Sequence, residues 1–211
     1  MYNPPAFRQH DVALLHAFIR MRRIGLLVSS ADAGPVATLL PLVLGASDSP
    51  LGTLNCHVSK ANEHWRGLDG ADVLVVFQGP DAYVTPAWYP SKAEHGKVVP
   101  TWNYVMVQAR GRARIVHDPE WLRHHVSQLT DENEQSQETP WKVSDAPSSY
   151  VQSLLLGIVG IEITLNSIDG KWKASQNRSA ADRLGVADGL TETGRDDMAT
   201  IVREASRTDN R

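Results

Sequence analysis

Two short segments of the chain combine side chains that suit a phosphate-bearing ligand. In CHVSKAN, a strand-like run ends in imidazole, hydroxyl, ammonium and amide groups, carried by His57, Ser59, Lys60 and Asn62. In KWKASQNR, an indole is surrounded by cations and small polar groups, carried by Lys171, Trp172, Lys173, Ser175, Gln176, Asn177 and Arg178. Such groups can hold a phosphate, with backbone N–H groups assisting. We expect both segments to bind an anion. The alternatives are an ordinary capped turn for the first and a solvated loop for the second.

Aromatic side chains are concentrated in one stretch, although only 7% of the residues are aromatic. The stretch contains Tyr83, Trp88, Tyr89, Trp102 and Tyr104, separated by Pro86, Pro90 and Pro100. A core is built more simply from aliphatic residues, so rings mixed with Thr, Asn and Pro indicate a shaped surface that holds something flat. We predict that Trp102, Asn103 and Tyr104 wall a ring system, while the lysine and amide groups hold its charged tail.

The remaining reactive side chains do not predict a conventional catalytic centre. The sequence lacks the glycine motifs of nucleotide folds, the serine motif of hydrolases and the HExxH zinc motif. The histidines have no acidic or cysteine partners at metal-ligand spacing, so we expect no metal site. His124 and His125 are interpreted as a solvated helix face, and Cys56 as a small buried side chain. The sequence identifies no catalytic acid, base or nucleophile.

The composition limits the kinds of partner. With 211 residues and 42% hydrophobic content, the chain can bury a sizeable core. Its formal net charge of -3 gives no overall attraction to DNA or to an anionic membrane, so DNA binding would need a local basic patch. The single cysteine excludes an intramolecular disulfide and fits a reducing cytoplasm. We expect neither a signal peptide nor a membrane-spanning run.

In the first half of the chain, the apolar pattern predicts a helix followed by strands. The helix is expected from Asp11 to the basic MRR, with an apolar side formed by Val12, Leu14, Leu15, Phe18 and Ile19. β-rich runs follow in the manner of an antiparallel meander, at 24–30, 35–44, 51–58 and 72–77. A turn is expected at QGP. A long strand at 101–116 should then bend at Gly111 and place Arg110, Arg112 and Arg114 on one face. This face is expected to be solvated, to bind an anion, or to pair with acidic residues across an interface.

The second half is predicted to contain helices and one more strand. A helix should begin after Asp118, with its buried face formed by Trp121, Leu122, Val126 and Leu129. A short helix capped by Ser148 or Ser149 and a last strand at 158–165 should follow. Beyond Ala180 we expect one or two loosely packed helices with a frayed end. Strands without alternating βα units indicate an α+β fold, mainly β, which is a small barrel with peripheral helices.

Several motifs together resemble the PaiB-type family, described as FMN-binding negative transcriptional regulators. They are MYNPPAF, CHVSKANEHW, YVTPAWY, VPTWNY, IVGIEI and KASQNR, and they cover nearly the whole chain. The resemblance implies a split β-barrel of the pyridoxamine-phosphate-oxidase-like kind, a homodimer, and FMN at the subunit interface. It also implies an FMN-binding split-barrel domain over residues 1–190 and a helical or partly disordered tail over 191–211. The chain departs from the family pattern at Cys56 and Glu63, where glycine and proline are usual.

Two functional classes follow from this reading. The first is a PaiB-type regulator that acts on gene expression directly or through a partner, although the sequence shows no DNA-binding motif and names no partner. The alternative is a flavin-dependent oxidoreductase or flavin reductase that uses the same pocket, since flavin itself carries hydride chemistry. Bleaching of bound flavin by NAD(P)H distinguishes the two.

Overall fold

The computed structural model describes residues 1–31, 33–45 and 49–208, and the chain divides into two compact units. Unit 1 comprises Met1–Asp11, Gln78–Val107 and Asp169–Arg211, and unit 2 comprises Val12–Phe77 and Gln108–Ile168. Three long strands contribute residues to both units. Among the described residues, no helix is long and apolar enough to cross a membrane.

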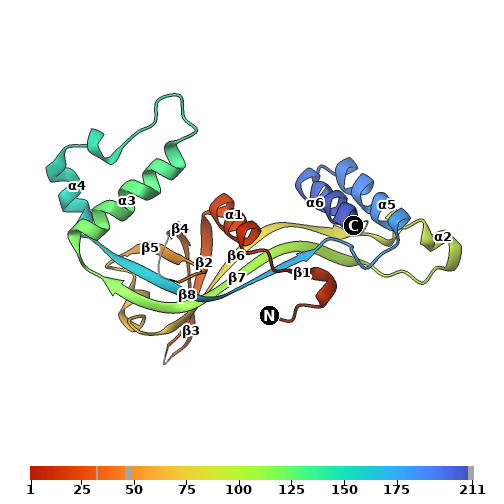
Figure 1. The fold of residues 1–211 in the computed structure, drawn as a ribbon, viewed down its shortest axis with the longest axis horizontal. Coiled ribbons are helices and arrows are strands. Elements are labelled where there is room, and N and C mark those ends of the chain that lie inside the picture. Colours follow the sequence, from red (N-terminus) through yellow and green to blue (C-terminus); the bar gives the residue numbers. More distant parts are fainter. Residues whose placement is uncertain (32, 46–48, 209–211) are drawn as a thin grey trace. The chain divides into compact units, whose positions relative to one another are not determined.

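The strands form one antiparallel sheet. They are β1 (Arg8–Gln9), β2 (Ile24–Ala31), β3 (Gly34–Pro41), β4 (Val43–Gly45), β5 (Thr53–Ser59), β6 (Asp72–Val84), β7 (Thr101–Val116) and β8 (Ile158–Lys173). Their order is β3-β2-β6-β7-β8-β5-β4, with β1 paired to β8 (Figure 1). Since β2 pairs with β6 and β5 pairs with β8, the expected simple meander is wrong. The predicted strands themselves are present.

Unit 2 has an aliphatic core covered by the first helix. β2 alternates between core and surface, as its period of two requires, and Leu27 of this strand is fully buried. α1 (Val12–Arg22) buries Leu15, Phe18 and Ile19. The predicted apolar side was too wide, because Val12 and Leu14 are exposed. Helical spacing places Leu15, Phe18 and Ile19 on one stripe, while Leu14 lies at its edge and Val12 is the first residue of the helix.

The close packing of β7 on β8 requires a glycine. A Cβ on Gly111 would overlap the backbone carbonyl of Thr164, so only glycine allows this approach of the strands. The three arginines of β7 lie on the face opposite the buried Ala109 and Ala113, as alternation predicts. Arg114 pairs with Glu162 of β8 at 2.9 Å.

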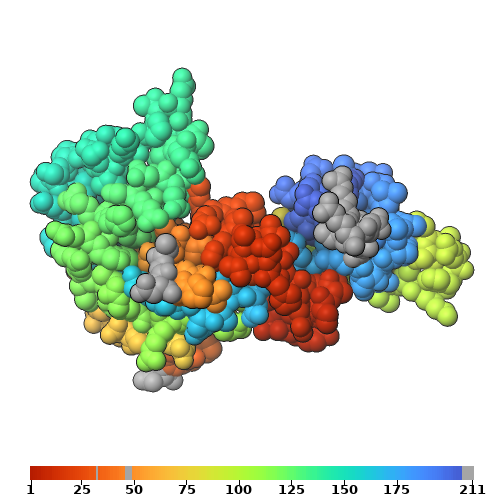
Figure 2. Space-filling model, in the orientation of Figure 1, coloured from red at the N-terminus to blue at the C-terminus, as the bar shows by residue number. Residues whose placement is uncertain are grey.

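Two helices follow the ends of β7 and β8 in unit 2. α3 (Pro119–Glu134) begins as predicted, with the Asp118 carboxylate accepting a hydrogen bond from the Glu120 N–H. α4 (Ser148–Leu155) follows the 3-10 helix η4 (Val143–Asp145). Its expected serine cap is wrong, because Pro147 occupies the N-cap and no side chain caps the helix. The segment between α3 and α4 stands out from the rest of unit 2 in Figure 2.

In unit 1, the C-terminal helices pack tightly. α5 (Ala180–Glu192) and α6 (Asp196–Thr208) form a core with the end of β6, through Ala82, Val84, Tyr89, Ala174, Val186, Ala187, Leu190, Met198, Ala199 and Val202. The expectation of loosely packed helices is therefore wrong. The apolar residues of α6 gather on one side, and this pattern supplies the buried face. The predicted boundary between a domain at 1–190 and a tail at 191–211 stays a prediction. Residues 209–211 lie outside the described part of the chain.

The middle of unit 1 contains the proline-rich stretch. Two short helices occupy it, η3 (Pro86–Trp88) and α2 (Ser91–His95). The Trp88 ring packs against Gly189 of α5, where a Cβ would overlap the indole. Two short elements complete the chain, η1 (Pro5–Phe7) in unit 1 and η2 (Glu63–Gly67) in unit 2.

Two strand boundaries differ from the sequence prediction. The QGP segment is not a turn, because β6 continues through it to Val84. β8 likewise runs past residue 165 to Lys173, so the first half of KWKASQNR is strand and not loop. Both strands continue into unit 1 because the residues beyond the predicted ends still pair within the sheet.

Candidate functional site

The predicted ring-binding and C-terminal segments meet in unit 1. The Lys173 ammonium donates hydrogen bonds to the Thr101 hydroxyl and to the Trp102 carbonyl, each at 2.5 Å. These contacts join the end of β8 to the beginning of β7. Trp102 and Tyr104 therefore lie beside the KWK segment, as predicted.

Lys171 and Lys173 form a cationic pair that has no acidic partner in the described part of the chain. Lys171 is only 7% exposed, and its ammonium donates to the Tyr2 carbonyl at 3.1 Å. No carboxylate of the described residues forms an ion pair with either lysine. Burial lowers the pKa of Lys173, and the charges of Lys171 and Arg178 lower it further. Each ammonium has three N–H donors, so both keep capacity for a ligand.

Aromatic rings surround this lysine pair. The Lys171 ammonium lies 5.2 Å from the Tyr104 ring centre and 5.7 Å from that of Tyr2. The Lys173 ammonium lies 5.9 Å from the Tyr104 ring centre. Trp102 is 53% exposed and meets Tyr83 edge to face, with ring centres 5.8 Å apart. Unit 1 thus offers flat apolar surface directly beside positive charge.

The small polar residues of KWKASQNR hold the turn after β8. Asn103 and Ser175 are both buried, and the Asn103 amide donates to the Ser175 hydroxyl at 2.9 Å. The Gln176 amide donates to the Trp172 carbonyl at 2.6 Å, while its oxygen accepts from the Ala174 N–H at 2.8 Å. Ser175 adopts a φ of 64°, a left-handed conformation that the buried contact with Asn103 supports.

Trp172, Asn177 and Arg178 lie at or beside this turn. Trp172 is half-buried, and Asn177 is exposed at the turn. The Arg178 guanidinium lies 4.9 Å from the Tyr89 ring centre. The lysines and aromatic rings are therefore the groups best placed to meet a ligand.

The other predicted segment lies in unit 2, where most of its polar atoms serve local structure. The Ser59 hydroxyl accepts from the Ala61 N–H at 3.2 Å, and the Asn62 side chain caps η2 by accepting from the His64 N–H at 3.1 Å. The Lys60 carbonyl accepts from the Trp65 indole at 3.2 Å. These bonds are the ordinary capped turn named above as the alternative. The Lys60 ammonium, in contrast, has no ion-pair partner among the described residues.

His125 corrects the prediction of a solvated helix face. It is 2% exposed, its Nε2 lies 3.1 Å from Nδ1 of His57, and its ring stacks on Trp121. Burial, with the neighbouring charges of His57 and His124, lowers the pKa of His125 to about 4. His124 is exposed, as expected. The signal for His125 was its spacing, because it follows the buried Leu122 by three residues and so shares its side of the helix.

His64 and Cys56 of unit 2 have structural roles. The Nε2 and Nδ1 atoms of His64 lie 2.8 Å from the Ser29 hydroxyl and 2.7 Å from the Thr38 hydroxyl, which ties η2 to the β2–β3 hairpin. No sequence motif indicated this link. Cys56 is fully buried, as predicted, and burial raises the pKa of its thiol to about 12. It is therefore no nucleophile at neutral pH.

The fold and the unit 1 residues together define a class, that of flavin-binding split-barrel proteins. A family model described as "Putative FMN-binding domain" matches residues 1–167. The chain is 36% identical to an Emericella nidulans protein, covering 97% of both chains. It is 31% identical to the Bacillus subtilis protein named "Protease synthase and sporulation protein PAI 2", covering 90% of this chain and 89% of that protein.

A solved structure supports the same fold. The FAD and haem binding protein from Mycobacterium smegmatis matches with a TM-score of 0.59 and 16% identity, covering 79% of this chain and 73% of that one. The chain belongs to the FMN-binding family that this model describes, together with its PaiB-type relative. Its fold is a split β-barrel. It therefore carries an FMN-binding domain.

The residues of unit 1 fit FMN. A phosphate needs positive charge and N–H donors, which Lys171 and Lys173 offer without competition from a carboxylate of the described residues. An isoalloxazine ring needs flat apolar surface, which Trp102 and Tyr104 offer. The matched residues 1–167 include Trp102 and Tyr104 but end before Lys171 and Lys173.

Proposed function

We propose that this protein is a PaiB-type regulator of gene expression that binds FMN and acts as a homodimer. One observation supports the cofactor assignment, the lysine pair at the Tyr104 ring and the Trp102 carbonyl, which has no carboxylate partner among the described residues. Lys171 and Lys173 hold the phosphate in this proposal. Trp102, Tyr104 and Trp172 contact the ring system, and Asn103, Ser175, Gln176 and Asn177 shape the loop around it. Contacts from His57, Ser59, Lys60 and Asn62 remain predictions.

The regulatory role is supported by the relative in Bacillus subtilis. Its name connects it with protease synthesis and sporulation, and the similarity extends over 90% of this chain. Bound FMN supplies reversible hydride chemistry, so a regulator that holds it is able to respond to redox state. The regulator acts on DNA directly or through a protein partner. We place it in the cytoplasm, where a free thiol such as that of Cys56 persists.

The homodimer is supported by exposed aromatic surface in unit 1. Trp102 is 53% exposed and Tyr83 48%, and the two rings are in contact. Contiguous exposed apolar surface often marks an interaction site. A second copy related by a two-fold axis would cover them and place FMN at the subunit interface.

Transcript profiling tests the regulatory role. Deleting the gene in the source organism should change a defined set of transcripts, and the wild-type gene should restore them. A Lys171→Met, Lys173→Met double variant should not restore them, while Lys97→Met, which changes an exposed lysine, should. Unchanged transcripts after deletion would contradict a regulatory role. If the double variant restores the transcripts fully, the regulatory role does not depend on Lys171 and Lys173.

The oxidoreductase alternative has its own readout. NAD(P)H added to the FMN-loaded protein in air should cause no sustained consumption of NAD(P)H if the protein is a regulator. Steady turnover at many equivalents of NAD(P)H per protein would instead assign it to the flavin reductases.

A further inference from the structure

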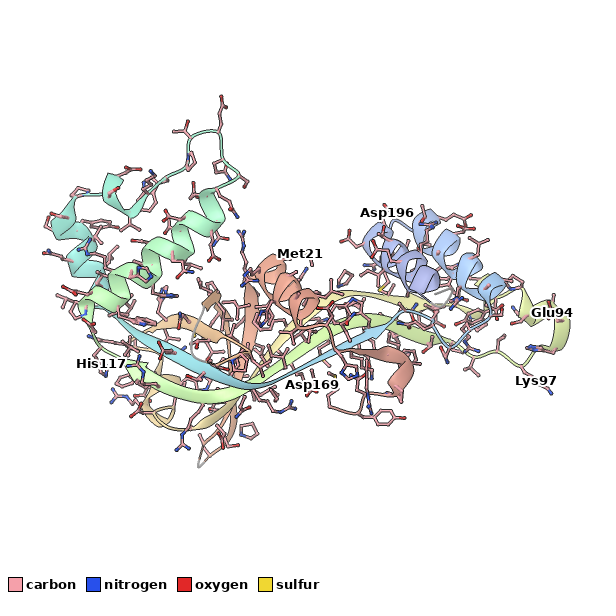
Figure 3. The ribbon with its side chains drawn as sticks, in the orientation of Figure 1. Met21, Glu94, Lys97, His117, Asp169 and Asp196 are labelled. Atoms are coloured by element: carbon pink, nitrogen blue, oxygen red, sulfur yellow. The ribbon has the colours of Figure 1, made fainter. Side chains whose placement is uncertain are left out.

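Unit 2 contains a pocket between α3 and α4, and of its lining residues only Lys60 is also a predicted FMN contact. Its volume is about 430 Å³, and its lining includes Lys60, His117, Glu120, Leu122, Arg123 and Leu155. Figure 1 shows α3 and α4 side by side, and Figure 3 places His117 at the end of β7, where α3 begins. The volume falls within the range of small-molecule sites, about 300–1,000 Å³.

The lining of this pocket is divided by polarity. Leu122 of α3 and Leu155 of α4 are 3% and 8% exposed and supply an apolar wall. Lys60 and Arg123 supply two cations, and neither has an ion-pair partner among the described residues. Glu120 is the single carboxylate among the lining residues, so positive charge is in excess.

The backbone around the pocket is held by contacts within unit 2. The Lys60 N–H donates to the Gly157 carbonyl at 2.9 Å, and the Trp65 indole donates to the Lys60 carbonyl at 3.2 Å. The Trp65 ring meets the His117 ring edge to face, with centres 5.7 Å apart. The Asp118 cap fixes the first turn of α3. A backbone held in this way reduces the ordering cost of binding.

We propose that this pocket binds an amphipathic organic anion, a carboxylate carried on an apolar body. Lys60 and Arg123 receive the carboxylate, and the leucine wall receives the apolar body. The assignment is independent of the lysine pair in unit 1.

Calorimetric titration with octanoate tests the proposal, with octanol and butyrate as matched probes. Octanoate should bind at one site per chain, more tightly than uncharged octanol and more tightly than the shorter butyrate. Lys60→Met and Arg123→Met keep the apolar stems and remove the charges. Each should weaken octanoate by roughly tenfold or more, the loss expected for a charged hydrogen bond. Octanol should be unaffected by either change.

The controls separate this site from nonspecific binding and from the FMN site. Lys97→Met removes an exposed lysine of unit 1 and should leave octanoate binding unchanged, and thermal melting checks that each variant is folded. Equal affinity for octanoate and octanol, or no loss in either variant, would overturn the proposal. So would competition between FMN and octanoate together with weaker FMN binding in both variants, because the pocket would then belong to FMN.

Discussion

His125 is a buried histidine whose neighbours keep it neutral in the folded protein. Its pKa is about 4 in the fold, against 6.5 for an unperturbed histidine, with burial as the main cause. Between these two values the unfolded chain binds a proton that the folded chain does not. The contribution of His125 to the free energy of unfolding is therefore fully present above about pH 6.5 and is lost as the pH falls toward 4. The loss from this residue is roughly 3 kcal/mol at about 1.4 kcal/mol per pKa unit.

Replacing His125 should flatten this acid dependence. In denaturant titrations at pH 7 and pH 4.5, His125→Gln should lose a few kcal/mol less stability on acidification than the wild type. His124→Gln is the matched control, because the neighbouring His124 is exposed. The pKa values of His57 and His64 are also lowered by burial, so some acid sensitivity should remain in both variants. Identical pH profiles for the two variants would show that His125 does not titrate as described.

Among single residues, the sequence predicted the clusters better than the role of each member. Lys171, Lys173, Trp102 and Tyr104 do come together. The roles of Asn103 and Ser175 in holding a turn depend on a contact across 72 positions, which no local motif reveals. His125 was predicted on the solvated side of the helix because its side chain is polar, although its spacing of three residues from Leu122 places it on the buried side.

At the scale of elements, α5 depends on two glycines that face η3. A Cβ on Gly185 would overlap the Trp88 carbonyl, and a Cβ on Gly189 would overlap the Trp88 ring. Glycine is a poor helix former, costing about 1 kcal/mol relative to alanine. Close packing therefore outweighs helix propensity at these positions.

Whether a substitution at Gly189 raises or lowers the free energy of unfolding tests this packing. Gly189→Ala should lower the free energy of unfolding by about 1–3 kcal/mol because the helix must shift from Trp88. Gly67→Ala is the control, since no atom lies within 4 Å of its added Cβ. Thermal melting with van't Hoff analysis supplies the measurement. A gain in stability for Gly189→Ala, as propensity alone predicts, would rule out the tight contact.

The strands were predicted well in their centres and poorly at their ends. Gly79 and Pro80 are typical turn residues, yet β6 passes through them. The buried positions change phase there, from Phe77 and Gly79 to Ala82 and Val84. Such an irregularity is set by the neighbouring strands, so local turn signals predicted a break where pairing continues. The helices beyond Ala180 were predicted, but their tight packing was missed for a similar reason, because their core includes residues of β6 and η3.

At the scale of the whole molecule, the account predicts a dimer. Trp102 is exposed in the single chain and faces no buried core, so its substitution should affect association more than folding. Light scattering at micromolar concentration with FMN present should give twice the 23.2 kDa chain mass for the wild type. Trp102→Glu should shift the mass toward that of one chain, with a melting temperature close to that of the wild type without FMN. A monomeric wild type would refute the dimer.

The central claim is that the lysine pair in unit 1 holds the FMN phosphate, and paired titrations with FMN and riboflavin test it most directly. Riboflavin has the ring system but no phosphate, so it separates the charged contact from ring stacking. Lys173→Met should weaken FMN by about 1.5–3 kcal/mol, the range for charged hydrogen bonds, and leave riboflavin nearly unchanged. Lys97→Met should affect neither ligand. Quenching of flavin fluorescence gives both affinities. Equal losses for FMN and riboflavin in Lys173→Met, or no loss for either, would contradict the assignment.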